Sequence, residues 1–303
     1  MESTRGLQSL RRCFTWNTSR RSVFPSRFAL TTRYLVPYVL IATFQYQVAK
    51  DGLNYSSPFV LVGLWYLIAS FLIFGVVRRF NPILNKDTVL LSLFTWASAG
   101  LWILGLQYVS PAESAVLSFT MPLISIPISS AILSEKATTN QWSGAVVGFV
   151  GVLIYSLQFV YHALTALGGA LTLMNAFFWA TYTVYYRKLR DQDPPMTVAT
   201  QLLIVGLLFV FFAPLNYRLV AAPSFWFDLA YLSILSAAVS SYLWNAMARS
   251  QRIGKASTLI YLIPATATLV QSVETSAIPA PSSLIGICLM ILGIYISRFE
   301  RTK

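Results

Sequence analysis

Residues 112–133 read AESAVLSFTMPLISIPISSAIL, and residues 254–275 read GKASTLIYLIPATATLVQSVET, so a shift of 142 positions lays one stretch on the other. The residues that coincide include Leu117 and Leu259, Pro122 and Pro264, and Ser130 and Ser272. Each stretch is long enough for one helical crossing of a bilayer core about 30 Å thick. We therefore predict that both stretches are membrane helices.

The composition of the whole chain extends this prediction. Hydrophobic residues make up 56% of the chain, charged residues only 11%, and the mean hydropathy is +0.63. The long apolar segments lack the period-2 alternation of a membrane β-barrel, which favours helices. We expect an all-α polytopic membrane protein with ten crossings, near residues 34–50, 57–77, 88–108, 112–133, 140–160, 164–186, 196–217, 225–247, 254–275 and 281–298.

The basic residues fall almost entirely into alternate gaps between these segments. If the N-terminus is cytoplasmic, the cytoplasmic gaps and tails hold 20 of the 22 Lys and Arg residues, and the outer gaps hold only Lys50 and Arg218. The positive-inside rule therefore predicts a multi-pass protein of the cell membrane with both termini cytoplasmic. The net charge of +12 does not indicate nucleic-acid binding, because no soluble domain carries a basic face.

The first 33 residues form a basic segment with seven Arg and a single acid, Glu2. A disordered cytoplasmic tail drawn to anionic lipid fits this composition, and so does an over-extended start of the reading frame. An organellar transit peptide is the third interpretation, and it would place the protein in an organellar membrane.

The repeat extends beyond the two quoted stretches. The 142-residue shift also pairs Gly144 with Gly286 and Gly151 with Gly293, while a shift of 137 pairs Lys50 with Arg187 and Pro58 with Pro195. Because five helices per repeat is an odd number, the second copy must enter the membrane from the opposite side. The predicted organisation is a tail at 1–33, two inverted five-helix repeats at 34–160 and 161–298, and a cytoplasmic tail at 299–303. Inverted repeats are typical of secondary transporters with a site near the membrane midplane.

Several motifs resemble the EamA-type transporters of the drug/metabolite transporter superfamily. They are Ala112-Glu113-Ser114-Ala115 to Pro122, Leu133-Ser134-Glu135, Gly144 to Gly151, Gly254-Lys255-Ala256 to Pro264, and Phe178-Trp179-Ala180-Thr181-Tyr182 with Arg187-Lys188. The resemblance covers residues 34–298. It implies that helices one to four and six to nine surround a central cavity, with helices five and ten outside. A helix-packing or dimer face would then contain Gly144, Gly148, Gly151, Gly286 and Gly293, in a monomer or a homodimer.

Three positions depart from the pattern of that family. Trp65 stands where the family usually carries an Arg, Ser134 replaces the Gly of the Leu-Gly-Glu exit, and Ala277 replaces an acidic residue, with Glu274 nearby. These departures leave the predicted fold intact. They put any substrate inferred from close relatives in doubt.

Cavity candidates come from proline, polar and aromatic residues inside the apolar segments. Proline bends a helix, and a polar side chain in hydrocarbon usually faces a partner or a water-filled cavity. The candidates are Gln45, Trp96, Ser118, Pro122, Asn175, Trp179, Tyr182, Tyr242, Thr258, Tyr261 and Pro264. For each, a packing kink or an interhelical hydrogen bond is the alternative. Trp102 and Trp244 lie nearer segment ends and are predicted to belong to the interfacial aromatic belts.

No acidic residue falls at the centre of a segment, since Glu113, Glu135 and Glu274 lie near helix ends. We therefore expect a transporter of a small neutral or zwitterionic metabolite, such as an amino acid, working by alternating access as an exporter or exchanger without a proton relay. Its partners would be the lipid bilayer and a small-molecule substrate, with no cofactor and no metal.

Two other functional classes remain open. A sensor or assembly subunit could use the same fold without transport. An integral-membrane enzyme is disfavoured, because His162 has no acidic or Cys companion nearby and Asp191 and Asp193 lie in a loop among basic residues.

Overall fold

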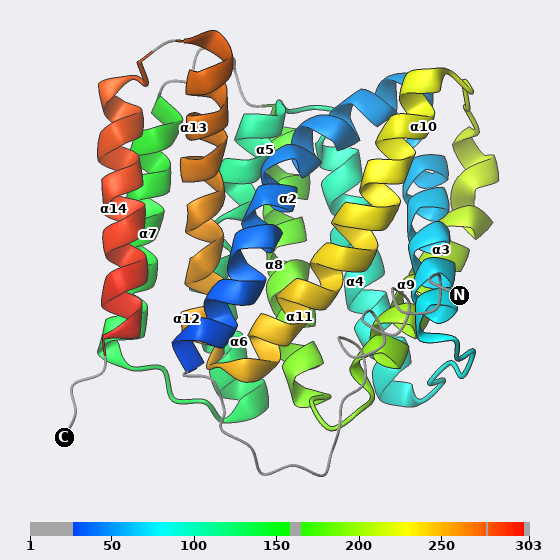
Figure 1. The fold of residues 1–303 in the computed structure, drawn as a ribbon, viewed down its shortest axis with the longest axis horizontal. Helices are drawn as coiled ribbons and strands as arrows, with labels where there is room; N and C mark the ends of the chain where they lie inside the picture. The colour runs from blue at the N-terminus through cyan, green and yellow to red at the C-terminus, as the bar shows by residue number, and fades with distance from the viewer. Residues whose placement is uncertain (1–26, 158–164, 277, 300–303) are drawn as a thin grey trace, which may run out of the picture.

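The computed structural model describes residues 27–157, 165–276 and 278–299, and these residues are helical almost throughout (Figure 1). Residues 1–26 of the predicted tail at 1–33 lie outside the described residues, as do His162 and Ala277. Residues 27–33 are not a disordered tail, because they form the first turns of α2. The α-helices are α2 (Arg27–Tyr55), α3 (Pro58–Val77), α4 (Lys86–Gly105), α5 (Pro111–Ser118), α6 (Met121–Leu133), α7 (Thr139–Ser156), α8 (Ala166–Lys188), α9 (Pro194–Phe212), α10 (Pro223–Ala230), α11 (Ser240–Ser250), α12 (Ile253–Ser257), α13 (Leu262–Thr275) and α14 (Pro281–Arg298). Short helices η2 (Ala213–Asn216), η3 (Tyr231–Val239, a π-helix) and η4 (Thr258–Tyr261) connect them.

Length and hydropathy make this a polytopic membrane protein. Within the described ranges, seven helical segments are long and apolar enough to cross a bilayer: Pro58–Val77, Lys86–Gly105, Pro111–Leu133, Pro194–Asn216, Pro223–Ser250, Ile253–Val270 and Pro281–Arg298. The remaining predicted crossings, at 34–50, 140–160 and 164–186, correspond to α2, α7 and α8, which the same criterion does not select.

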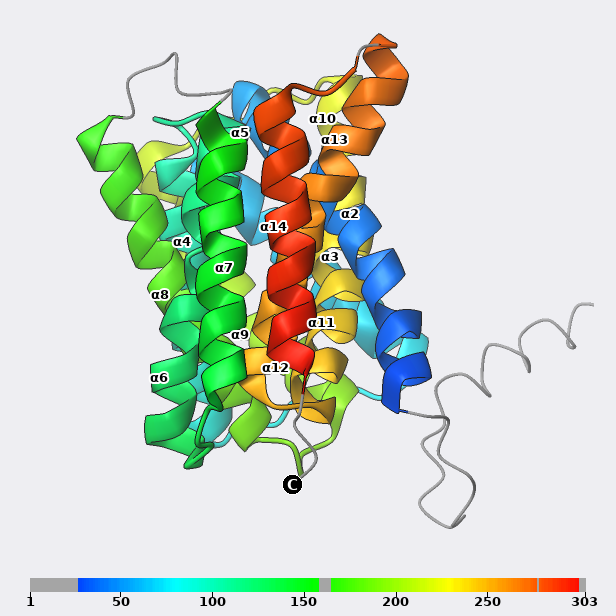
Figure 2. The ribbon, with the colours of Figure 1, turned by 90° about the vertical axis from the view of Figure 1, so that its left-hand side faces the viewer.

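The outer surface is rich in large apolar side chains. Phe71, Val76, Phe211, Leu292 and Tyr295 are each between 46% and 75% exposed. Soluble monomers rarely expose apolar patches on this scale, so this surface requires an apolar solvent such as lipid. The start of α2 and the end of α14 lie at the same end of the bundle (Figures 1 and 2).

The helices begin and end where the sequence provides the appropriate residues. Ser110 and Glu113 form a capping box at the start of α5, in which each side chain accepts a hydrogen bond from the other residue's backbone N–H. Asn85 and Thr138 cap α4 and α7 in the simpler way, through one side-chain oxygen. Glu113 is therefore used at a helix end, as its position in the sequence suggests.

The two quoted stretches are broken helices. The first ends α5 at Ser118 and resumes with α6 at Met121, so Pro122 lies in the first turn of α6. In the second, η4 separates α12 from α13, and Pro264 lies in the first turn of α13. Proline fits a first helical turn because its missing N–H has no intrahelical acceptor there. At equivalent places, therefore, the α-helix is interrupted by a two-residue turn in the first stretch and by the 3-10 helix η4 in the second.

Ser134 ends α6 in the left-handed backbone region, with φ 55° and ψ 24°, and Ser276 ends α13 in the same way with φ 51°. Glycine adopts this conformation without strain, which explains why the family pattern has a Gly at this helix end.

We expect Ser134→Gly to raise the free energy of unfolding by about 1 kcal/mol, because the left-handed region strains residues that carry a Cβ. Thermal unfolding in detergent would measure the gain. Ser134→Ala is the control and should give none; equal midpoints for the two variants would contradict this explanation.

The helices pack in pairs that join distant parts of the chain. The most extensive contacts join α7 with α14, α3 with α9, α4 with α8 and α6 with α8, followed equally by α2 with α11, α3 with η3 and α4 with α9. One buried apolar cluster lies around Trp65, Trp102 and Phe209, and a second lies around Tyr38, Trp244 and Tyr261. Helices α7 and α14 lie at the left-hand edge of the bundle in Figure 1 and stand side by side in front in Figure 2.

Candidate functional site

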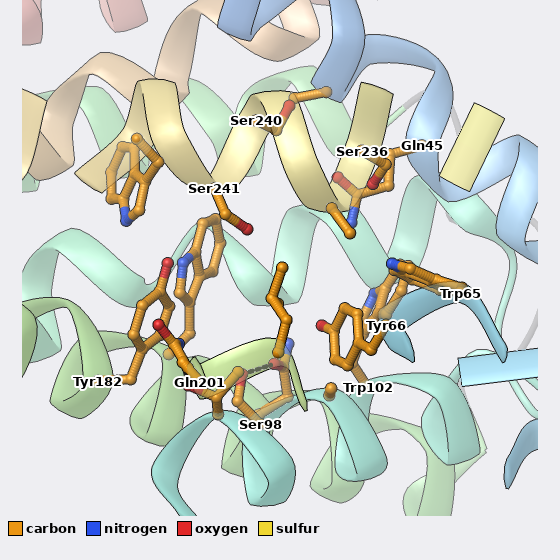
Figure 3. Close-up of a pocket in the computed structure, with 18 of the residues that line it drawn as sticks. Gln45, Trp65, Tyr66, Ser98, Trp102, Tyr182, Gln201, Ser236, Ser240 and Ser241 are labelled. Atoms are coloured by element: carbon orange, nitrogen blue, oxygen red, sulfur yellow. Dashed lines mark hydrogen bonds between the residues drawn. The ribbon is translucent and has the colours of Figure 1, made fainter. Parts of the chain in front are cut away.

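A cavity of about 130 Å³ lies between α2, α3, α4, α8, α9, η3, α11 and α13 (Figure 3). Its size is comparable to the cavity of roughly 150 Å³ that admits benzene in a well-studied engineered protein. None of the residues that line it is charged. They are Tyr38, Ala42, Gln45, Tyr46, Trp65, Tyr66, Thr95, Ser98, Ala99, Trp102, Asn175, Trp179, Tyr182, Gln201, Leu202, Ser236, Ala237, Ser240, Ser241, Trp244 and Ile263. The cavity can therefore admit a small solute.

Two amide side chains organise the polar part of the cavity. Asn175 on α8 accepts a hydrogen bond from Ser98 Oγ at 2.8 Å and donates one to Ser118 Oγ at 3.2 Å. Gln201 on α9 donates to Thr95 Oγ1 at 2.6 Å. These bonds tie α8 to α4 and α5, and α9 to α4, and they fix which way each amide faces.

Some polar atoms in the cavity wall have no hydrogen-bond partner in the described structure. They are Trp65 Nε1, Trp102 Nε1, Gln201 Oε1, Ser236 Oγ and Ser240 Oγ. Buried polar atoms are nearly always paired, because an unpaired one costs about 1–3 kcal/mol. The cavity wall therefore contains unpaired donors at the two indole nitrogens, an unpaired acceptor at Gln201 Oε1 and two unpaired hydroxyl groups.

Aromatic rings make up much of the remaining wall. Tyr38 stacks on Trp244 with ring centroids 5.2 Å apart, and Trp179 lies 5.9 Å from Trp244. Elsewhere in the cavity Trp102 makes edge contacts with Tyr46 at 5.4 Å and with Trp65 at 6.1 Å. These rings offer apolar faces to a guest and hold one another in fixed orientations.

The structure brings part of the predicted candidate set into the cavity. Gln45, Asn175, Trp179 and Tyr182 line it, and Ser118 supports it through Asn175. Pro122, Tyr242 and Pro264 do not line it.

The other three candidates make hydrogen bonds or ring contacts outside the cavity. Trp96 packs against Phe209 and Phe212, with ring centroids 6.0 and 5.8 Å away. Thr258 pairs with Ser297 at 3.0 Å, and the Tyr261 hydroxyl donates to the carbonyl of Ala145.

Sequence reasoning missed several wall residues. Trp102 and Trp244 are not interfacial, since they are 6% and 2% exposed and both line the cavity. A signal was present: on α4 the lining residues Thr95, Ser98, Ala99 and Trp102 follow the i, i+3, i+4, i+7 spacing of one helix face. The same spacing selects Asn175, Trp179 and Tyr182 on α8. A search for polar and aromatic stripes would have found these faces.

The predicted glycine face lies where α7 meets α14. A Cβ on Gly144 would lie 2.5 Å from the carbonyl oxygen of Gly293, and one on Gly151 would lie 2.7 Å from that of Gly286. A Cβ on Gly148 would overlap the ring of Tyr261. These glycines let the two backbones touch within one chain.

Two cationic side chains, Arg187 and Lys50, donate hydrogen bonds to carbonyl groups at helix ends. Arg187, at the end of α8, donates to Glu135 at 2.6 Å and to the carbonyls of Ala248 and Arg249 at 2.9 Å. Glu135 also accepts from the backbone N–H of Ile253. Near the end of α2, Lys50 donates to the carbonyls of Leu106, Gln107 and Val109, which follow α4. Each cation thus neutralises the carbonyl end of another helix.

Comparison with known proteins identifies a transporter family that matches the chain twice. The EamA-like transporter family matches residues 34–157 and again residues 166–299. A protein of Acidianus ambivalens described as an uncharacterized transporter in sor 3'region is 43% identical over 242 residues, which cover 79% of this chain and 93% of that protein. A probable amino-acid metabolite efflux pump of Salmonella typhimurium is 23% identical, over 86% of this chain and 92% of that protein.

A solved crystal structure superposes with a TM-score of 0.76 over 89% of this chain and 98% of the other, and its 19% identity makes this a likeness of fold alone. The family match covers nearly all of the described residues, in two consecutive copies. The chain is therefore a multi-pass membrane protein that belongs to the EamA-like transporter family of the drug/metabolite transporter superfamily.

Proposed function

We propose that this chain is a secondary transporter that moves a small neutral or zwitterionic solute by alternating access, as an exporter or exchanger. The observation that carries the proposal is the uncharged cavity, whose wall comes from α2, α3 and α4 of the first repeat and from α8, α9, η3, α11 and α13 of the second. A site shared by two repeats can open to either side as they rock against each other.

The proposed architecture is ten transmembrane helices in two inverted repeats, 34–160 and 161–298. It is supported by the packing, which recurs when the repeats are exchanged. The contact of α4 with α8 has its counterpart in α11 with α2, and that of α6 with α8 in α13 with α2. Under the same exchange α3 and α9 map onto each other, as do α7 and α14, and each of these pairs is in contact.

The cation contacts at the two ends support the inversion independently. Lys50 and Arg187 differ by 137 positions, and their acceptors Leu106 and Gln107 differ by 142 positions from Ala248 and Arg249. In each repeat, therefore, the cation near the end of the first helix binds carbonyls at the C-terminal end of the third, in the last turn of α11 or directly after α4. An inverted repeat accounts for the placement of the two clusters at opposite ends.

The charge of the preferred solute follows from the wall. A net charge that leaves water for a cavity without charged residues does so at a cost of several kcal/mol. A zwitterion carries its own counter-charge, so its two ends can satisfy each other in part. The relative described as a probable amino-acid metabolite efflux pump supports an amino-acid-like solute.

Location and assembly complete the proposal. Both termini would be cytoplasmic in the cell membrane, as the basic residues suggest and as the shared end of α2 and α14 in Figure 1 supports. The glycine face is occupied by the contact of α7 with α14 within the chain, which supports a helix-packing role over a dimer face.

A flux measurement tests the proposal. Purified protein in liposomes should give saturable counterflow of L-valine or L-threonine, and none of L-glutamate or L-lysine. Uptake should not follow an imposed pH gradient, because no carboxylate lines the cavity. Protein-free liposomes are the control. Binding without any flux would favour a non-transporting sensor or assembly subunit, and uptake that tracked the pH gradient would contradict the coupling.

A further inference from the structure

The indole N–H groups of Trp65 and Trp102 are unused donors in the cavity wall. The two side chains belong to residues that are 1% and 6% exposed, and neither Nε1 atom has a partner in the described structure. An indole nitrogen can only donate a hydrogen bond, so each of these N–H groups needs an acceptor, and the described residues provide none. Buried tryptophans usually satisfy this N–H. Two unsatisfied donors in one cavity therefore indicate a guest with an acceptor.

The indole rings of Trp65 and Trp102 are in contact. Trp65 on α3 and Trp102 on α4 meet edge to face, with ring centroids 6.1 Å apart. Figure 3 shows both on one side of the cavity, beside Tyr66, while Tyr182 and Gln201 lie on the other side. Gln201 Oε1 is an unpaired acceptor, while the amide nitrogen of the same side chain donates to Thr95. The cavity thus has a donor side and an acceptor side.

We propose that the indole N–H groups of Trp65 and Trp102 bind the carboxylate or carbonyl oxygen of the transported solute, while Gln201 Oε1 accepts a hydrogen bond from its amine or hydroxyl end. This assignment rests on the proposed transport function and names the residues that determine its specificity. The wall contains no cation, so a carboxylate binds here when the solute carries its own positive group. The polarity of the wall therefore selects α-amino acids over simple carboxylates and simple amines.

Removal of each N–H group tests the assignment. Trp65→Phe and Trp102→Phe keep an aromatic ring and remove the donor, so the Kd for L-valine should rise about tenfold for each, the effect of losing one hydrogen bond to a charged group. Trp96→Phe is the matched control. Trp96 is also on α4 and also has an unpaired Nε1, but it packs against Phe209 and Phe212 outside the cavity. Its Kd should stay within twofold of the wild-type value.

A second measurement uses the unmodified protein. With ¹⁵N-labelled tryptophan, L-valine should shift the indole signals of Trp65 and Trp102 downfield and leave that of Trp96 in place, with the three variants providing the assignments. Isobutylamine, which is valine without its carboxylate, should shift neither.

The outcomes separate this inference from the transport function. Counterflow of L-valine with unmoved signals and unchanged Kd values would overturn the inference and leave transport standing. Moved signals without flux would support the inference and remove the transport function. If L-valine neither moved the indole signals nor gave counterflow, both the inference and the transport function would be overturned.

Discussion

Arg187→Gln should destabilise the protein by about 2 kcal/mol, because this partly buried ion pair lies between an exposed pair, worth at most about 1 kcal/mol, and a fully buried pair, whose disruption costs about 3–5 kcal/mol. The Arg187 and Glu135 side chains are only 12% and 19% exposed, and the change also leaves the carbonyls of Ala248 and Arg249 without their donor. The measurement is the thermal midpoint of purified protein in detergent, supported by a denaturant series.

Arg79→Gln is the matched control for this prediction. Arg79 and Asp193 form an ion pair at 2.9 Å, but their side chains are 58% and 35% exposed, so the loss should stay below about 1 kcal/mol. Equal losses for the two variants would mean that the interior contacts of Arg187 contribute nothing beyond a surface pair.

Glu135→Gln separates the ion pair from the carbonyl contacts. The glutamine retains an oxygen that can accept from the Ile253 N–H, and Arg187 retains its two carbonyl acceptors. The loss should therefore be smaller than for Arg187→Gln. In the double variant the effects should not add, since both residues belong to one network.

The membrane character of the fold could be predicted from the sequence because it depends on residue type. Hydropathy alone identifies long apolar helices, and the prolines at 122 and 264 mark the interruptions because a proline constrains its own backbone wherever it lies. The sequence could not distinguish a kink from a break. That outcome depends on how η4 and the residues between α5 and α6 pack against their neighbours.

The cavity was only partly predictable, because it depends on which face of each helix points inward. Trp96 and Trp102 are six residues apart on α4, which places them about 120° apart around the helix. One packs against Phe209 and the other lines the cavity. In a helix that is apolar all round, the hydrophobic pattern does not identify the inner face. The aligned polar residues Thr95 and Ser98 do identify it, and they lie on the face of Trp102.

Gly293→Ala should destabilise the protein by about 1–3 kcal/mol, the usual range for forcing extra atoms into a packed interior. The new Cβ would lie 2.5 Å from the Gly144 carbonyl oxygen and 2.5 Å from the Gly148 backbone nitrogen. Both are backbone atoms, so relief requires α7 and α14 to move apart along their contact. The thermal midpoint in detergent is again the measurement.

Gly75→Ala is the control, because it makes the same chemical change near the end of α3, where no atom lies within 4 Å of the new Cβ. Alanine is the better helix former by about 0.5–1 kcal/mol, so this variant should be as stable as the wild type or more so. Both substitutions carry that intrinsic gain, and the difference between them isolates the contact between α7 and α14. A Gly293→Ala protein as stable as Gly75→Ala would show that the two helices can separate freely, and the glycine face would then have no packing role.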